Sequence, residues 1–224
     1  QLQGNNSQRL KQCRLMCLSD ATGSMSATWA STRNMIQEVI RRIEEIGGAN
    51  IDMQWVAYRD YSDSLPLQKS GWTHDPDVLR RFVTSITCKG GAGKAGHDNG
   101  EEAVELALQL VCTEHAKADV TRVILIGDYP PHREKRGHFL HSHDHLMQTD
   151  YVHETQQLAK LGIPVYAFYL EEQARQAFEY IAKSTGGTAE LLCDSDGLID
   201  VVCKNALEDI GGEELVAEYC QRYG

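Results

Sequence analysis

Three aspartates follow apolar runs that are typical of buried strands, and they are the side chains with the clearest chemistry. Asp20, Asp60 and Asp128 each stand at or just after the end of such a run. In an open parallel sheet, ligands bind beyond the carboxyl ends of the strands, near the point where the strand order reverses. Three acidic strand ends on one edge therefore predict a bound cation.

The segment after Asp20 adds two hydroxyl groups to these carboxylates. Thr22 and Ser24 stand at two-residue spacing, with Gly23 between them to let the turn fold tightly. Hard oxygen ligands select Mg²⁺, Mn²⁺ or Ca²⁺ over zinc, and Mg²⁺ keeps several waters, which leaves a position for a partner. Spacing alone fits a helix cap about equally well, because Asp and Thr are also preferred capping residues.

The elements that must position these groups alternate along the chain. Apolar runs predict strands over 14–19, 51–58, 122–127, 163–170 and 188–192, with a weaker edge pair around 65–72. Apolar residues at three- and four-residue steps predict helices over 36–46, 79–86, 103–110, 174–181 and 199–210. This alternation is typical of an α/β protein in which helices cover a parallel sheet.

Composition limits the classes of partner. The 224 residues, 42% of them hydrophobic, suffice for one sizeable core. The formal charge of −10 disfavours nucleic acid and anionic membranes, and it fits cations or basic partners better. The longest apolar runs fall far short of the roughly 20 residues that span a bilayer, so we expect no membrane span.

Cysteine usage and chain organisation give weaker expectations. The seven cysteines form an odd set without a C-x-x-C pair, which favours reduced thiols and an intracellular, cytoplasmic protein over an extracellular one. The first residue is Gln, so we expect the chain to be part of a larger protein or complex. We predict a lead-in over 1–12, one domain over 13–210, and a final helix or a linker over 211–224.

Several segments resemble one family in order. Residues 20–25 resemble the D-x-T-G-S-M form of the metal-ion-dependent adhesion site (MIDAS) of von Willebrand factor type A (vWA) domains. Residues 56–60, 96–102 and 126–132 are similar to the Y-R-D, G-G-D-x-P-E and D-A-P-P-H segments of alpha-kinase-linked and hemicentin-type vWA domains. The likeness covers roughly 13–210. It departs at Gly100, which replaces the Pro, and at Tyr129, which replaces the Ala.

The resemblance implies a doubly wound, Rossmann-like, mostly parallel sheet of about six strands with helices on both faces. It also implies a non-catalytic domain that uses a divalent ion to engage or shape a protein interface. Its metal residues carry over as Asp20, Thr22 and Ser24 from the first loop and Asp128 from the fourth, with Thr22 and Ser24 touching the ion and Asp20 holding it through water. Asp98 stands in the loop that supplies a Thr in integrin-type domains, and we predict that it replaces this Thr.

The resemblance further implies that a carboxylate of the partner completes the coordination of the ion. A third carboxylate in place of the Thr would make the site more anionic. It would favour tighter ion binding but weaken the pull on an acidic partner group.

An alternative function is a phosphohydrolase of the haloacid-dehalogenase type. Residues 18–24 are similar to the strand-end D-x-D-G-T of that family, in which Asp20 would be the phosphoryl nucleophile. Thr22, however, stands where a general-acid Asp is needed, and it donates a proton less easily. No cap domain is apparent either.

Two further motifs have simpler interpretations. Residues 91–96 match G-x-G-x-x-G but follow a helical stripe instead of a strand, which favours a flexible loop beside the metal. His138, His141, His143 and His145 could ligate zinc, yet no Cys or distant His completes the set, so we favour a solvated loop. His132 could instead orient the loop that carries Asp128.

Overall fold

Six strands form one sheet in the order β3-β2-β1-β4-β5-β6. The computed structural model describes residues 12–48, 51–61, 63–91, 100–132, 149–192 and 195–224. The strands are β1 (Cys13–Asp20), β2 (Ile51–Tyr58), β3 (Leu67–Lys69), β4 (Arg122–Gly127), β5 (Val165–Tyr169) and β6 (Ala189–Leu191). All neighbours are parallel except β3, which pairs antiparallel with β2. The predicted doubly wound, mostly parallel α/β sheet is therefore confirmed.

The strand order reverses between β1 and β4. The chain first adds β2 and β3 on one side of β1, then returns to add β4, β5 and β6 on the other side. The carboxyl ends of β1 and β4 therefore flank the point at which such folds bind ligands.

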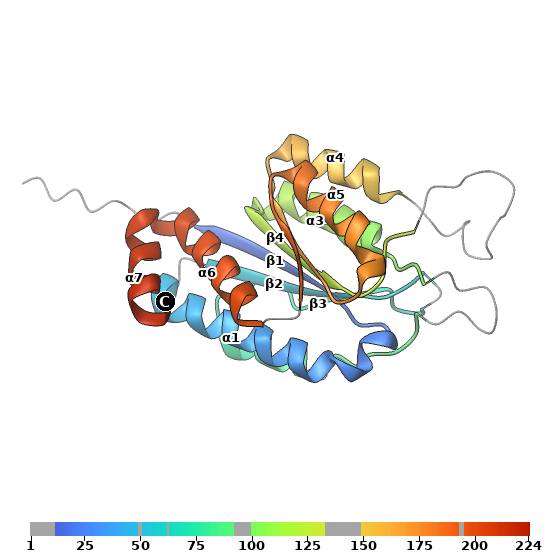
Figure 1. Ribbon diagram of the computed structural model, residues 1–224, viewed down its shortest axis with the longest axis horizontal. Coiled ribbons are helices and arrows are strands. Elements are labelled where there is room, and N and C mark those ends of the chain that lie inside the picture. Colours follow the sequence, from blue (N-terminus) through green and yellow to red (C-terminus); the bar gives the residue numbers. More distant parts are fainter. Residues whose placement is uncertain (1–11, 49–50, 62, 92–99, 133–148, 193–194) are drawn as a thin grey trace, which may run out of the picture.

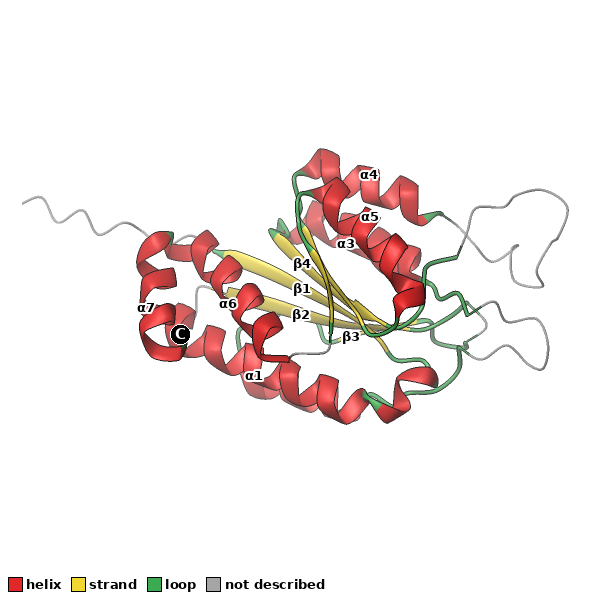
Figure 2. Ribbon diagram, viewed as in Figure 1, coloured by secondary structure: helices red, strands yellow, loops and turns green. Residues whose placement is uncertain are grey.

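Helices cover both faces of the sheet (Figures 1 and 2). One side carries α1 (Trp29–Gly47), α2 (Pro76–Ser85), α6 (Ser195–Gly211) and α7 (Glu213–Tyr223), and a short 3-10 helix, η1 (Ser24–Ala27), precedes α1. The other side carries α3 (Val104–Ala118), α4 (Tyr151–Leu161) and α5 (Glu172–Thr185).

The central strands are buried on both faces, which explains their unbroken apolar runs. In β1, Leu15 and Cys17 pack into the core under α1 and α6, whereas Met16 and Leu18 pack into the core under α3 and α5. Parallel strands covered on both sides carry this kind of sequence.

Two helices lie in segments with little or no periodic pattern of apolar residues. The inward face of α4 presents Glu154 and Thr155 beside Leu158, so the apolar stripe that would reveal a helix is largely missing. Asp150 caps α4 by accepting a hydrogen bond from the backbone N–H of His153 at 2.8 Å. The segment 211–224, open between a helix and a linker, forms α7 after Gly212, whose φ of 62° interrupts the chain direction.

The predicted edge pair around Leu65–Trp72 is simpler than expected. It contains one strand, β3, and the residue that follows the segment, Thr73, forms an isolated antiparallel bridge with Met53. Edge positions are half exposed, so their side chains carry a weak pattern.

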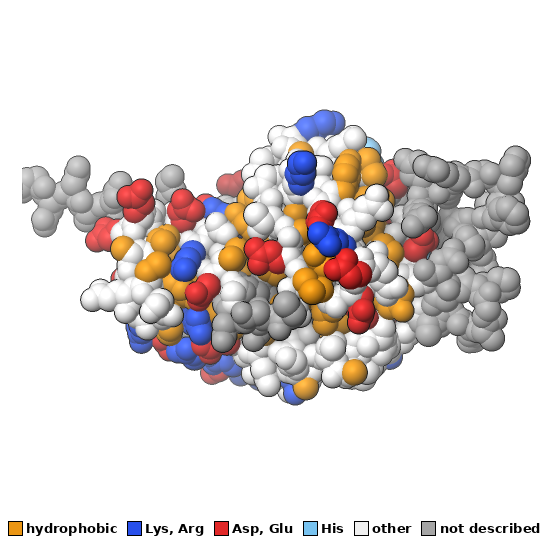
Figure 3. Space-filling model, viewed as in Figure 1, with side chains coloured by type: hydrophobic (Ala, Val, Ile, Leu, Met, Phe, Trp, Pro, Cys, Tyr) orange, Lys and Arg blue, Asp and Glu red, His pale blue; other side chains and the backbone are white. Residues whose placement is uncertain are grey.

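The corner between α1, α6 and α7 is held by polar contacts. Arg42 donates to the hydroxyl of Tyr219 at 2.9 Å and to Asp200 at 3.1 Å. Basic and acidic side chains of the described residues are interspersed on the face shown in Figure 3, and they form no extended basic patch there of the kind that binds a phosphate backbone. None of the described helices is both long and apolar enough for a bilayer crossing.

Candidate metal centre

The ends of β1 and β4 bring Asp20 and Asp128 together. The two strands are paired up to Ser19 and Ile126, and each aspartate follows within two residues. Gly127 permits a close approach here, because a Cβ at this position would lie 2.3 Å from the hydroxyl oxygen of Tyr58. That hydroxyl donates to the carbonyl of Ile126 at 3.1 Å and thereby ties the end of β4 to β2.

The turn after Asp20 directs two hydroxyls toward the carboxylates. Oδ1 of Asp20 accepts a hydrogen bond from the backbone N–H of Thr22 at 2.7 Å. The hydroxyl of Thr22 donates to Oε1 of Glu102 at 2.6 Å and lies 2.9 Å from the hydroxyl of Ser24. The capping positions of η1 and α1 are Gly23 and Thr28, and neither makes a side-chain cap. Asp20 and Thr22 therefore do not serve as caps for the helix that follows.

A glycine segment supports this turn from behind. The backbone N–H of Gly23 donates to the carbonyl of Gly90 at 3.0 Å, and that of Lys89 donates to Ala21 at 3.0 Å. Gly91 has a φ of +71°, and a Cβ on it would lie 2.5 Å from Cβ of Thr22. The start of the predicted glycine loop thus lies against the site, while residues 92–96 lie outside the described residues.

Glu102 supplies a third carboxylate that the sequence interpretation did not select. Its backbone N–H donates to the carbonyl of Pro130 at 3.0 Å, and the next N–H, of Ala103, donates to Arg59 at 3.1 Å. These bonds fix Glu102 between the segments that follow β2 and β4. One oxygen from each of Asp20, Glu102 and Asp128 lies within 4.8 Å of the other two.

The remaining predicted residues have different outcomes. Asp60, the third acidic strand end, turns to His132 instead, with its Oδ1 2.7 Å from Nε2. Asp98 and the cluster His138–His145 lie outside the described residues. Ser24 is exposed, so it marks the side on which the carboxylates approach solvent.

His132 joins the segment after β4 to its surroundings. Besides Asp60, it faces Glu101, with Nδ1 3.7 Å from Oε2. Burial lowers the pKa of His132, but the hydrogen bond with Asp60 and the nearby charges of Glu105, Asp60 and Glu101 outweigh burial and raise it overall. These contacts agree with the hypothesis that His132 orients the segment carrying Asp128.

The three carboxylates are buried and repel one another. Asp20, Glu102 and Asp128 are 0%, 3% and 6% exposed. Burial raises the pKa of Glu102 to about 7 and that of Asp128 to about 7, and it raises the pKa of Asp20 well above its usual range. Two unit charges 4.8 Å apart repel by roughly 3.5 kcal/mol at an effective dielectric constant of about 20. Ionising all three groups together without a cation is therefore costly.

The donor set fits a hard divalent cation. Asp20 Oδ2, Glu102 Oε2 and Asp128 Oδ1 are buried and find no hydrogen-bond donor among the described residues, because they face one another's carboxylates. An unpaired buried carboxylate oxygen is costly, and an oxygen-ligated Mg²⁺, Mn²⁺ or Ca²⁺ would relieve that cost. Asp20, Thr22, Ser24, Glu102 and Asp128 are the residues that would hold the ion.

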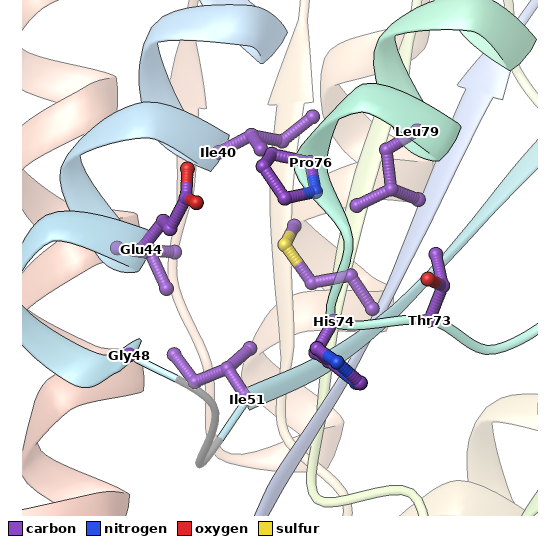
Figure 4. A pocket seen from close by; sticks show the side chains of 10 residues that line it. Ile40, Glu44, Gly48, Ile51, Thr73, His74, Pro76 and Leu79 are labelled. Carbon is purple, nitrogen blue, oxygen red and sulfur yellow. The ribbon is translucent and has the colours of Figure 1, made fainter.

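A small pocket lies at the opposite end of the strands from the three carboxylates (Figure 4). The pocket is lined by side chains of α1, such as Ile40, by Ile51 at the start of β2, and by Pro76 and Leu79 of α2. Because β2 begins at Ile51, this pocket is at the amino ends of the strands and takes no part in the carboxylate site.

Comparisons with known proteins support the fold and leave the family open. No family model matches the chain. Over 177 residues, or 76% of the chain, it is 28% identical to an ariadne-like RING finger protein of Acanthamoeba polyphaga mimivirus, and it spans only 17% of that protein's length.

Two solved structures share the architecture. The open form of the pilus adhesin SpaC of Lactobacillus rhamnosus GG superposes with a TM-score of 0.65 at 11% identity, over 95% of this chain and 31% of the adhesin. Proximal thread matrix protein 1 of the mussel byssus gives a TM-score of 0.61 at 16% identity, over 88% of this chain and 46% of that protein. At these identities the likeness concerns the fold alone.

Proposed function

We propose that this chain is a vWA-type domain that binds a divalent cation, with Mg²⁺ favoured over Mn²⁺ or Ca²⁺, and uses it to engage or shape a protein interface without catalytic turnover. The observation that carries the proposal is the set of three unpaired carboxylate oxygens of Asp20, Glu102 and Asp128, buried where the strand order reverses. A fold that keeps such a set must stabilise it with protons or a cation, and oxygen ligands of this type suit Mg²⁺.

The hydroxyls of Thr22 and Ser24 complete the proposed site. Thr22 is already hydrogen bonded to Glu102, so its hydroxyl oxygen lies beside the carboxylates without a large movement. Ser24 is exposed and is the donor nearest to solvent. An ion held in this way has a buried side, fixed by the protein, and an outer side on which a partner can bind.

One comparison supports a role within a larger protein. The mimivirus relative is several times longer than this chain, which is expected of a module joined to other domains. For the compartment we propose an intracellular location, since the six described cysteines are free and Cys13, Cys17 and Cys203 are buried.

The structure gives no observation that favours the phosphohydrolase alternative. Asp20 is fully buried and accepts a hydrogen bond from the backbone of Thr22, which is poor placement for a nucleophile that must reach a phosphate. The hydroxyl of Thr22 donates a hydrogen bond to Glu102, which speaks against a role for Thr22 as the missing general acid.

Calorimetric titration of the purified domain with Mg²⁺ and Mn²⁺ tests the proposed site. We expect Asp20→Asn to raise the dissociation constant at least about 100-fold, because it removes a buried ligand charge. Asn keeps the shape of the side chain and the oxygen that accepts from Thr22. Asp119→Asn is the matched control, since Asp119 is exposed at the other end of α3 and its φ of 56° suits Asn.

Two results would contradict the proposal. Equal ion binding by the wild type and Asp20→Asn would remove the site assignment. Release of phosphate from generic phosphoesters by the wild type and not by Asp20→Asn would overturn the non-catalytic role.

A further inference from the structure

The candidate ion site holds more negative charge than a divalent cation neutralises. Asp20, Glu102 and Asp128 contribute three carboxylates, while Thr22 and Ser24 contribute neutral hydroxyls. Three ionised carboxylates around a divalent ion leave one net negative charge. All three are more than nine-tenths buried and keep an oxygen that finds no donor among the described residues.

None of the described cations near this edge pairs with the three carboxylates. The guanidinium of Arg59 is buried and keeps its charge, but it donates to the carbonyl oxygens of Leu65 at 3.3 Å and Thr87 at 3.0 Å and not to a carboxylate of the site. His132 is paired with Asp60 at 2.7 Å. Lys89 is exposed, where water and salt screen its charge. The ion would therefore face its ligand from a site that stays anionic.

The extra charge comes from Glu102, and its placement is built into the fold. The carboxylate accepts from Thr22 at 2.6 Å, and the backbone is held by the carbonyl of Pro130 at 3.0 Å. Glu102 is therefore held within the site, so an incoming ligand cannot displace it to solvent without breaking these contacts.

On the basis of the proposed ion site, we infer that a partner reaches the ion through a neutral oxygen, an amide carbonyl or a hydroxyl, and that Glu102 excludes carboxylate ligands. A carboxylate would bring a further charge to an anionic site with buried carboxylates, whereas a neutral oxygen binds the ion through its dipole without that repulsion. This ligand class differs from the partner carboxylate that the sequence resemblance implies. It agrees with the chain's formal charge of −10, which itself disfavours acidic partners.

The test uses the full chain loaded with saturating Mn²⁺, with acetate as the carboxylate probe and N-methylacetamide as the neutral one. Electron–nuclear double resonance with ¹³C-labelled probes reports whether each probe binds directly to the ion. For the wild type we expect a ¹³C coupling from N-methylacetamide and none from acetate. Glu102→Gln, which removes the charge and keeps the shape, should bind acetate at least about tenfold more tightly than the wild type. Asp119→Asn removes an exposed charge at the other end of α3, outside the site, and should behave as the wild type.

The outcomes separate this inference from the function on which it rests. If the wild type shows no bound Mn²⁺, the proposed ion site fails. If Mn²⁺ binds and acetate coordinates it equally in the wild type and in Glu102→Gln, the ion site stands and the inference is wrong. Acetate bound only in Glu102→Gln supports both.

Discussion

Glu102→Gln is expected to weaken Mg²⁺ binding by at least about 30-fold and to make the ion-free domain more stable than the wild type. The first effect follows from the loss of a ligand charge. The second follows because Glu102 is 3% exposed and faces two other carboxylates, so its ionised form is destabilising whenever no cation is present. Gln retains an oxygen that can accept from Thr22, and we expect a gain of about 1–3 kcal/mol in the free energy of unfolding at about pH 8.

Urea unfolding in EDTA and in excess Mg²⁺ measures both effects on the same samples. Asp119→Asn is the control, because it removes an exposed charge at the other end of α3, away from the three carboxylates. If Glu102→Gln were less stable than the wild type in EDTA, Glu102 would be a structural hydrogen-bonding residue and not a ligand held ready for a cation.

The second large effect is a loss of stability of the ion-free domain as the pH rises from about 5 to about 8. Burial raises the pKa of Glu102 from 4.5 to about 7, so the folded state binds more protons than the unfolded state over this range. For a carboxyl with a raised pKa, the stability is highest below the unfolded pKa and is lost as the pH rises through the folded pKa. One pKa unit corresponds to about 1.4 kcal/mol, so Glu102 alone accounts for roughly 3 kcal/mol.

Neighbouring groups act in the same direction within this window. The pKa of Asp128 is also raised to about 7, and His132, whose pKa is raised, loses its favourable charge as the pH increases. The pKa of Glu38 is lowered to about 2 by its hydrogen bond with Arg41, so its contribution is lost only under more acidic conditions.

Thermal unfolding in EDTA at several pH values measures this slope. We expect the melting temperature to fall by on the order of 10 °C between about pH 5 and about pH 8, and saturating Mg²⁺ to reverse most of the loss. Glu102→Gln should show a shallower slope. A melting temperature that rises with pH in EDTA would show that the carboxylates are stabilised by groups other than a cation.

Sequence periodicity predicted the central sheet well because its strands are buried on both faces. The predicted bounds of β2 and β4 match the structure, and those of β1 differ by one residue at each end. The edge strands β3 and β6 are only three residues long and partly exposed, so their patterns are short and weak. Helix α4 was missed because its inward face is largely polar, with Glu154 and Thr155 buried beside Leu158.

Those residues of the candidate site that directly follow a strand were predictable from the local sequence. Asp20, Thr22, Ser24 and Asp128 follow directly from two adjacent strands, and the structure brings all four together. Glu102 lies in an irregular segment ahead of α3, and its position depends on the carbonyl of Pro130, which is remote in sequence. The one available signal was the family-like segment 96–102, which ends on Glu102.

Asp60 is the opposite case to Glu102, because the sequence singles it out and the structure places its carboxylate elsewhere. Its position after β2 resembles those of the other two strand-end aspartates, so sequence alone predicts the same role. In the structure the segment turns after Tyr58, and the carboxylate accepts from the N–H of Tyr61 at 2.7 Å and meets His132. The direction of the loop after each strand decides whether its aspartate reaches the candidate site. That direction depends on contacts with residues remote in sequence.

A crystal structure of the domain grown with Mn²⁺ is the most direct test of the proposed cation site, because anomalous scattering locates the ion itself. We expect one strong anomalous peak among the carboxylate oxygens of Asp20, Glu102 and Asp128, next to the hydroxyls of Thr22 and Ser24, and no peak there in Asp20→Asn. The absence of a peak at these residues in crystals of the wild type, or a peak that persists unchanged in Asp20→Asn, would contradict it.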